Sequence, residues 1–249
     1  MIIIKSPREI DLIRKSSRII AECFDIVAPH IKPGITTRAL DEIIIDHIKH
    51  RGGKSAFKDY NGYPGNICVS IDEEVVHGIP GDRVLEEGQI VSIDVGVILN
   101  NYYGDAARTF PVGVISDAKK KLLTVTEEAL FQGIDAARIG NRLSDISNAI
   151  QTHVEKENFS VVRDLVGHGV GRRLHEEPQI PNYGEPHRGP RLQEGMVFAI
   201  EPMVNMGTYQ VVVADDNWTI YTKDKLSSAH FEHTIAITQS DPEILSIIT

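Results

Sequence analysis

The sequence has only two cysteines in 249 residues, and it has no long apolar run. Cys23 and Cys68 stand far apart and in no metal-binding spacing, so neither a disulfide framework nor a thiolate metal site is expected. Residues 1–5 place three isoleucines before the first charge, Lys5, which is too short for a signal peptide or a membrane span. We therefore expect a cytoplasmic protein that does not enter a membrane.

Positive charge is also scarce. Lysine and arginine number 26 against 35 acidic residues, which gives a net charge of −9. A protein that binds duplex nucleic acid needs a basic stripe, and nothing beyond the triplet at residues 119–121 resembles one. Nucleic acid is therefore not an expected partner. Hydrophobic residues make up 41% of the chain, which is adequate for one packed core.

What the sequence does contain is a repeated plan of helices followed by strands. Ser6 and Glu9 have the spacing of a capping box, with Pro7 at the first helical position. Apolar spacing then predicts helices that begin at about residues 7, 37, 117 and 144. No linker divides the chain, so we expect a single catalytic domain spanning 1–249, with pseudo-repeat halves at about 1–112 and 113–249.

Two stretches read as copies of one another. Residues 85–94 (LEEGQIVSID) and 192–201 (LQEGMVFAIE) share Leu, Glu, Gly and Ile at matching places. Each ends an apolar, strand-like run with a carboxylate, Asp94 or Glu201. A carboxylate on a buried strand is costly unless it is paired or binds a metal. Its recurrence in register predicts a site between two related halves.

Strand geometry predicts a second carboxylate, that of Asp105, near Asp94. Residues 90–99 and 102–111 read as the strands of a hairpin, because Asn100 and Asn101 can supply the positive φ angles of a tight turn. In that register Asp94 faces Ala107, and Gly96 faces Asp105. Side chains two apart share a face of a strand, so Asp94 and Asp105 are diagonal neighbours roughly 7–8 Å apart at the backbone. Unpaired, these carboxylates would repel, so a shared cation is expected.

The second half supplies further polar groups. Glu232 lies in a strand-like run at residues 231–237, and His168 stands between glycines, where no bulky neighbour blocks close approach. With Asp94, Asp105 and Glu201 these make a set of four carboxylates and one imidazole. Two divalent cations would cancel the four negative charges. Two metals about 3.5–4 Å apart, bridged by carboxylates and a water, are a known arrangement for hydrolysis.

Five short motifs follow one another along the chain. They are VVHGIP at 75–80, SIDVG at 92–96 with Gly104 and Asp105, GHGVG at 167–171 with HEEP at 175–178, AIEP at 199–202, and FEHT at 231–234. Each motif alone is weak evidence, but all five in order make the chain similar to the type I methionine aminopeptidases. The resemblance runs from the first helix to about Thr238. It implies an α+β pita-bread fold, in which two pseudo-symmetric halves pack helices on a curved antiparallel sheet.

The resemblance also implies a function and a role for each ligand. The function is removal of the N-terminal methionine from nascent proteins and peptides whose second residue is small, by a hydroxide that bridges two divalent metal ions. Asp94 would chelate one metal, His168 and Glu201 would bind the other, and Asp105 and Glu232 would bridge both. Oxygen-rich ligands with one imidazole suit Co, Mn, Fe or Zn, and the ligands alone do not identify which of these is used.

Three residues match the family's catalytic groups. Glu201 resembles its proton carrier as well as a metal ligand. His77 and His175 match its two histidines that contact the scissile peptide and the tetrahedral intermediate. A neutral histidine can donate a hydrogen bond to a developing oxyanion, and this bond strengthens only in the transition state. For both histidines a structural role is the alternative. The remaining candidates are expected to be surface or packing residues: His47, His50, His153, His187, His230 and His233.

The family pattern also maps a methionine pocket. It falls on Tyr60, Tyr63, Cys68 and Trp218, a set with two aromatic hydroxyls at the rim and a sulfur suited to a thioether. Phe57 stands where many bacterial members have cysteine, and Leu174 stands where an aromatic residue usually precedes His175. Packing residues are the alternative for Phe57 and Leu174, so the shape of the pocket is less well defined than the chemistry.

Two other functions remain as alternatives. An X-Pro aminopeptidase-like enzyme shares the fold, but such relatives usually carry a large amino-terminal domain, for which the helical start leaves no room. A non-catalytic pita-bread interaction module would lack metal ligands, whereas this sequence keeps all of them. The expected partners are nascent polypeptide N-termini. Transient association with the ribosome is left open, and we expect a monomer.

Overall fold

The computed structural model describes residues 1–248 as helices alternating with blocks of short antiparallel strands. The helices are α1 (Pro7–Val27), α2 (Thr37–His50), α3 (Asp117–Ala136) and α4 (Leu143–Lys156), with short 3-10 turns η1 (Ala28–His30) and η2 (Tyr60–Gly62). The strands are β1 (Lys54–Ser55), β2 (Cys68–Ile71), β3 (Glu74–Val76), β4 (Ile90–Leu99), β5 (Tyr102–Pro111), β6 (Ser160–Val161), β7 (Gly167–Gly169), β8 (Glu176–Ile180), β9 (Val197–Ile200), β10 (Met203–Asn205), β11 (Val211–Val213), β12 (Ile220–Thr222), β13 (Ser228–His230), β14 (His233–Ala236) and β15 (Glu243–Ile244).

The first helix begins as its sequence predicts. The Glu9 N–H donates to Oγ of Ser6 over 3.4 Å, and the Ser6 N–H donates to Oε2 of Glu9 over 3.0 Å. This reciprocal pair satisfies two of the backbone donors that a helix start leaves free. Helix α3 ends at Ala136, and the chain then turns toward Gly140, whose φ is +99°.

The hairpin of β4 and β5 has the predicted register. Asp94 pairs with Ala107, Gly96 pairs with Asp105, and the turn residues Asn100 and Asn101 have φ angles of 52° and 64°. Alternate residues of β4 divide between two faces. Ile93, Val95 and their neighbours pack in one apolar core cluster with residues of α1 and α2, so Asp94 is directed to the opposite face.

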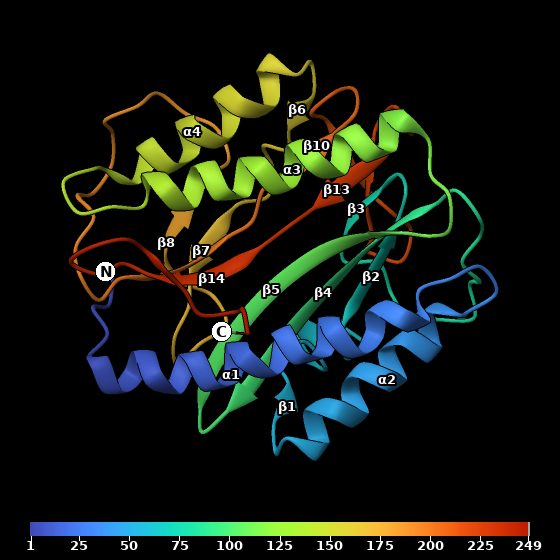
Figure 1. The fold of residues 1–249 in the computed structure, drawn as a ribbon, viewed down its shortest axis with the longest axis horizontal. Helices are drawn as coiled ribbons and strands as arrows, with labels where there is room; N and C mark the ends of the chain where they lie inside the picture. The colour runs from blue at the N-terminus through green and yellow to red at the C-terminus, as the bar shows by residue number, and fades with distance from the viewer. Residues whose placement is uncertain (249) are drawn as a thin grey trace.

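The two halves join where β5 of the first half meets β14 of the second. The Glu232 N–H donates to the Ala107 carbonyl oxygen over 2.9 Å, and Oγ1 of Thr234 donates to the Asp105 carbonyl oxygen over 2.7 Å. Figure 1 shows α1 and α2 along one side of the molecule and α3 and α4 along the other, with β5 and β14 between them. This junction brings a carboxylate from each half to the same place.

The strands form several small sheets. One has the order β1–β4–β2 with β5 on β4, and another has the order β15–β14–β9–β7–β8. The smaller sheets are β13–β10–β6 and β11–β12–β3. Between Glu201 and Glu232 lies the hairpin of β11 and β12, which pairs with β3 of the first half. Among the helices of residues 1–248, none is both long and apolar enough to cross a membrane.

Candidate functional site

A cavity of about 200 Å³ collects the residues that the sequence singled out. Its lining residues are Phe57, Tyr60, Asn61, Tyr63, Cys68, His77, Asp94, Asp105, His168, Leu174, His175, Glu201, Trp218 and Glu232. Each predicted ligand, catalytic and pocket residue is among them, and Asn61 is an addition. The structure thus brings both halves of the chain to one site. The roles of these residues remain predictions.

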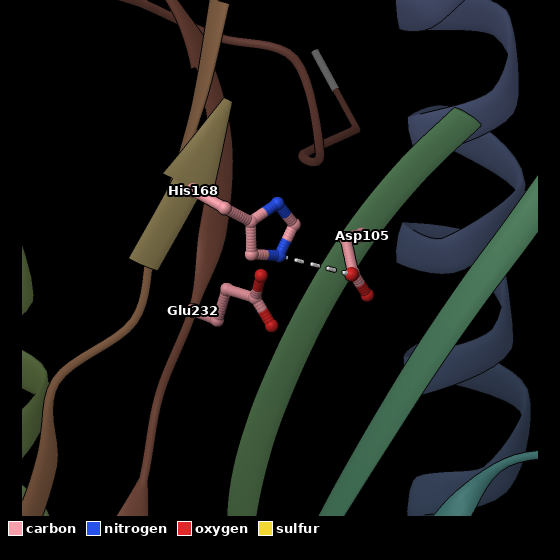
Figure 2. A group of neighbouring side chains, drawn as sticks. All are labelled: Asp105, His168 and Glu232. Carbon is pink, nitrogen blue, oxygen red and sulfur yellow. Dashed lines mark ion pairs between the residues drawn. The ribbon is translucent and has the colours of Figure 1, made fainter. Parts of the chain in front are cut away.

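The acidic side chains reach the cavity from adjacent strands. Asp94 and Asp105 come from the β4–β5 hairpin, and Glu201 and Glu232 flank the paired strands β9 and β14, where Ile200 pairs with His233. His168 lies on β7, which pairs with β9 through Ala199. Figure 2 shows Asp105, His168 and Glu232 directed toward one another. One donor atom from each of these three lies within 4.8 Å of the others, which is compatible with a shared metal ion.

The remaining distances place Glu201 beside this group. Nε2 of His168 is 3.6 Å from Oδ2 of Asp105 and also 3.6 Å from Oε1 of Glu201. These separations are too long for hydrogen bonds. They are the spacing expected of side chains that converge on a common centre.

Several carboxylate oxygens are buried without a partner. Within residues 1–248, Oδ1 of Asp94, Oδ1 of Asp105 and Oε1 of Glu232 are buried and make no hydrogen bond. Burial raises the pKa of Asp94 to about 7. Burial and repulsion from neighbouring carboxylates raise the pKa values of Asp105, Glu201 and Glu232 as well. Such a cluster needs protons or cations to be stable, because buried charges that lack counter-charge are costly.

His168 is prepared to act as a neutral ligand. Burial lowers its pKa to about 3, so the ring is uncharged at neutral pH. Nδ1 is 3.0 Å from the carbonyl oxygen of Gly169, which can only accept a hydrogen bond. The ring hydrogen therefore lies on Nδ1, and the lone pair of Nε2 is directed toward the carboxylates. This is the form of imidazole that binds a metal.

His77 and His175 stand at the cavity outside the acidic cluster. Burial lowers the pKa of both rings, that of His77 to about 4, so both are neutral near pH 7. His77 has a φ of 61°, an uncommon conformation for a residue with a side chain, and such angles are concentrated at functional positions. A Cβ on the following Gly78 would lie 2.2 Å from the Val69 carbonyl oxygen, so this turn requires glycine.

His230, predicted as a surface or packing residue, is buried beside Glu201, although it is not among the residues that line the cavity. It is 1% exposed, and its Nε2 is 3.7 Å from Oε2 of Glu201. In the described part of the chain neither of its ring nitrogens makes a hydrogen bond. The sequence held a signal for this position, since His230 stands two residues before Glu232 and residues two apart along an extended chain share a face.

The predicted methionine pocket forms a small apolar cluster. It contains Phe57, Tyr63, Cys68 and Leu174, with Tyr60 and Trp218 packed against it. The rings of Tyr63 and Trp218 meet edge to face with centroids 5.2 Å apart. A Cβ on Gly96 would lie 2.5 Å from Phe57, so this glycine admits the phenylalanine ring. Phe57 and Leu174 thus both line the cavity and pack within it.

One detail of the pocket prediction was wrong. Tyr63 is 3% exposed, and the carbonyl oxygens of Ile67 and Gly78, 3.1 and 2.9 Å from its hydroxyl, share the single hydrogen that it donates. Its hydroxyl therefore supports the turn that carries His77 and is not at the rim. Tyr60 does present its hydroxyl to the cavity, where it lies 2.8 Å from Nδ1 of His175.

The other histidines lie away from the cavity, as predicted. His47, His153 and His187 each lie near a carboxylate, with N···O distances of 2.9, 3.1 and 3.1 Å. His50 is exposed at the end of α2. His233 is turned away from the cavity, and its Nδ1 is 2.8 Å from Oγ of Ser246.

Comparison with known proteins gives consistent relatives. Residues 11–239 match metallopeptidase family M24. The chain is 58% identical over 246 residues to methionine aminopeptidase 1 of Bacillus subtilis (strain 168), covering 99% of each. The crystal structure of methionine aminopeptidase from Thermotoga maritima has a TM-score of 0.98 and 47% identity, with 100% of both chains covered. Prolidase from Pyrococcus furiosus has a TM-score of 0.80 and 25% identity, and the match covers 99% of this chain but 66% of that one.

These neighbours share the pita-bread fold, so the predicted α+β class is confirmed. A metallopeptidase uses divalent metal, which agrees with the unpartnered oxygens of the carboxylates that line the cavity. The resemblance carried by the five motifs is therefore confirmed, and the chain belongs to metallopeptidase family M24.

Proposed function

We propose that the protein is a methionine aminopeptidase, which removes the N-terminal methionine from peptides and nascent chains whose second residue is small. The observation that carries this proposal is the joining of two features in one cavity: a cluster of unpartnered carboxylates and an apolar pocket of side-chain size. The names of the relatives in Bacillus subtilis and Thermotoga maritima support the same activity.

The donor set fits two divalent cations. Asp94, Asp105, Glu201 and Glu232 bring four negative charges, and two divalent ions would balance them. Asp94 would hold one ion and His168 with Glu201 the other, while Asp105 and Glu232 would bridge. Oxygen donors with one imidazole favour Mn, Fe, Co or Zn. Bound ions of this kind lower the pKa of water, so that hydroxide is available at neutral pH.

The chain's own groups would complete the reaction. The neutral rings of His77 and His175 can each donate one hydrogen bond to the oxygen of the peptide carbonyl as it gains negative charge. Glu201 has a raised pKa and can hold a proton released by the nucleophile before passing it to the departing amine. The apolar cluster around Tyr63, Cys68 and Trp218 would hold the methionine side chain, with the sulfur of Cys68 beside the thioether.

The proposal extends to the surroundings of the enzyme. Its partners would be the N-termini of newly made chains, reached in the cytoplasm as they leave the ribosome, with which any contact would be transient. We propose that it acts as a monomer with residues 1–249 as one catalytic domain, because one chain supplies the complete set of predicted ligands, catalytic groups and pocket residues. Size-exclusion chromatography with light scattering tests the oligomeric state.

The decisive experiment measures release of free methionine from a Met-Ala-Ser peptide, with and without a chelator. Release that stops with the chelator supports the proposal. A parallel assay with an Ala-Pro-Ser peptide tests the X-Pro alternative, for which cleavage before proline would exceed release of methionine. No release from either peptide by the metal-loaded protein would instead favour a non-catalytic interaction module.

A further inference from the structure

Lys5 is far from the predicted catalytic residues in the sequence. Its buried side chain nevertheless contacts the segment that carries His175. It is 5% exposed, and its Nζ is 2.7 Å from Oε2 of Glu176, whose side chain is 2% exposed. A buried ammonium needs an opposite charge and further acceptors, because its loss of hydration is otherwise uncompensated. Glu176 and the carbonyl oxygen of Ile3, 3.0 Å from Nζ, supply these.

The second oxygen of Glu176 holds the loop between β7 and β8. Oε1 accepts hydrogen bonds from the N–H groups of Arg172 and Arg173 over 2.8 and 3.2 Å. A Cβ on Gly171 would lie 2.7 Å from Oε1 of Glu176 and 2.8 Å from Cε of Lys5. The loop backbone therefore packs directly on the ion pair, and glycine makes this approach feasible.

This loop joins the two histidines of the cavity. It begins after Gly169, the last residue of β7 and the neighbour of His168, and ends at His175, which directly precedes β8. The rings of His168 and His175 are 4.3 Å apart between centroids and meet edge to face. Leu174, on the same loop, lines the pocket. A shift of the loop would therefore move His175 relative to the acidic cluster.

The backbone at Lys5 is fixed as well. Its N–H donates to the carbonyl oxygen of Gly195 over 2.8 Å, in the turn that leads into β9 and Glu201. A Cβ on Gly195 would lie 2.7 Å from the carbonyl oxygen of Lys5, so this contact is also close. Lys5 thus connects the turn before Glu201 to the loop before His175.

We propose that Lys5 is a positioning residue: through the carboxylate of Glu176 it fixes the loop of residues 170–175 and with it the direction of the His175 ring. It does not contact substrate. The proposal rests on the methionine aminopeptidase function given above. It goes beyond that function by assigning the N-terminal segment a part in the geometry of the transition state.

The test needs variants that fold. Lys5→Met alone leaves the Glu176 charge buried and unpaired, so the main variant is Lys5→Met/Glu176→Gln. It removes both charges, keeps the side-chain volumes similar, and retains an amide oxygen that can accept from Arg172 and Arg173. Lys5→Arg keeps the charge. Lys15→Met is the matched control, since this lysine of α1 has a side chain that is 55% exposed.

For the double variant we expect kcat on Met-Ala-Ser to fall about tenfold, with KM and bound metal per chain unchanged, because misplacement of a group that acts in the transition state lowers kcat. The single variant Lys5→Arg, which keeps the positive charge, should have most of the wild-type kcat. Lys15→Met should have the same kcat as the wild type. In a His175→Ala background the double variant should lower kcat less than about twofold further, since the contribution of His175 is already lost.

A double variant with wild-type kcat overturns the proposal, and so does a loss of equal size in the His175→Ala background. The ¹⁵N chemical shifts of the histidine rings in the metal-free protein report the environment of His175 without depending on catalysis. The His175 signals should move in Lys5→Met/Glu176→Gln and stay in place in Lys15→Met. Unmoved His175 signals contradict the positioning role, whereas a wild-type protein that releases no methionine contradicts only the proposed function.

Discussion

The hydroxyl of Tyr60 lies 2.8 Å from Nδ1 of His175. Burial lowers the pKa of His175, so the ring is neutral at pH 7 and has one hydrogen to donate. If the phenol donates to Nδ1, the ring hydrogen lies on Nε2. Tyr60 would then determine the tautomer in which His175 can donate to substrate, as partners of functional histidines commonly do.

The first prediction concerns this pair. His175→Ala should lower kcat about 10²–10³-fold, the usual loss for one donor to an oxyanion, and leave the metal content unchanged. Tyr60→Phe should lower kcat by a smaller factor, since the ring remains but its tautomer is no longer fixed. Steady-state kinetics and elemental analysis of the same preparations measure both quantities, with His50→Ala as the control. Metal content that falls together with the rate would show that His175 holds metal or supports its ligands.

The second prediction concerns metal. Excess chelator should abolish release of methionine, and Mn, Co or Fe should restore it. Asp105→Ala or Glu232→Ala should remove both metal binding and activity, because each carboxylate is expected to serve both ions. Asp46→Ala, at an exposed position of α2, is the matched control. Full activity in a preparation that elemental analysis shows to be free of metal contradicts the prediction.

Rules that relate a short stretch of sequence to its local structure were sufficient to predict the elements that carry the site residues. The capping box at Ser6 and the hairpin turn at Asn100 and Asn101 are local features, and both are present as expected. Once the turn is known, the register of β4 and β5 follows from pairing, so the relation of Asp94 to Asp105 could be derived from the sequence.

Contacts between distant segments could not be derived in this way. The meeting of β5 with β14 and the ion pair of Lys5 with Glu176 each join residues far apart in the chain. No periodicity or spacing encodes such contacts. The buried hydroxyl of Tyr63 illustrates the same limit, since its acceptors depend on how the turn at Gly78 packs.

The third prediction uses the raised pKa of Asp94. In the metal-free folded chain this pKa is about 7, above the ordinary value of 3.8. Between these values Asp94 holds a proton in the folded chain that it has released in the unfolded chain, so the Asp94 contribution to stability decreases as pH rises from about 4 to 7 and then levels off. The raised pKa values of Asp105, Glu201 and Glu232 add to the decrease in total stability, and the comparison with Asp94→Asn isolates the part that belongs to Asp94. Asp94→Asn has no such proton. It should match the wild type near pH 4 and be more stable at pH 7.5 by about 2–4 kcal/mol.

Denaturant unfolding in the presence of a chelator, at a series of pH values, measures this difference. Asp46→Asn should show no such trend. A difference between wild type and Asp94→Asn that stays constant with pH, or that grows toward acid, contradicts the assigned burial of Asp94. Added metal should reverse the order, because the wild type binds it through ionised carboxylates and gains stability by mass action.

The fourth prediction concerns the contact between α1 and the hairpin. A Cβ on Gly104 would lie 2.5 Å from Oγ and 2.6 Å from the backbone N of Ser17, so Gly104→Ala must displace the helix. We expect it to destabilise the fold by about 2 kcal/mol or more. Gly81→Ala is the control, because its Cβ would be 4.0 Å from the nearest atom. Thermal unfolding of the two variants tests this, and equal midpoints would count against the packing.

The last prediction concerns the second residue of the substrate. The cavity has a volume of about 200 Å³, and a bound methionine side chain would share it with the acidic cluster. A large second side chain would therefore clash near the cluster. Phe57 and Leu174 belong to the apolar cluster that is proposed to hold methionine, and they should not relax this limit. We expect high kcat/KM for Met-Ala and Met-Gly peptides and little for Met-Ile or Met-Lys.

Met1 and Ile2 of this chain provide a second test of the preference for a small second residue. Ile2 is β-branched and bulky, so a chain expressed from Met1 should not process itself. Intact-mass measurement should find Met1 retained, whereas an Ile2→Ala version should lose it during expression. Ile3→Ala serves as the control and should retain Met1, because the altered residue lies one position beyond the crowded approach. Efficient cleavage of a Met-Lys peptide, or loss of Met1 from the unaltered chain, would show that this approach is wider than the cavity implies.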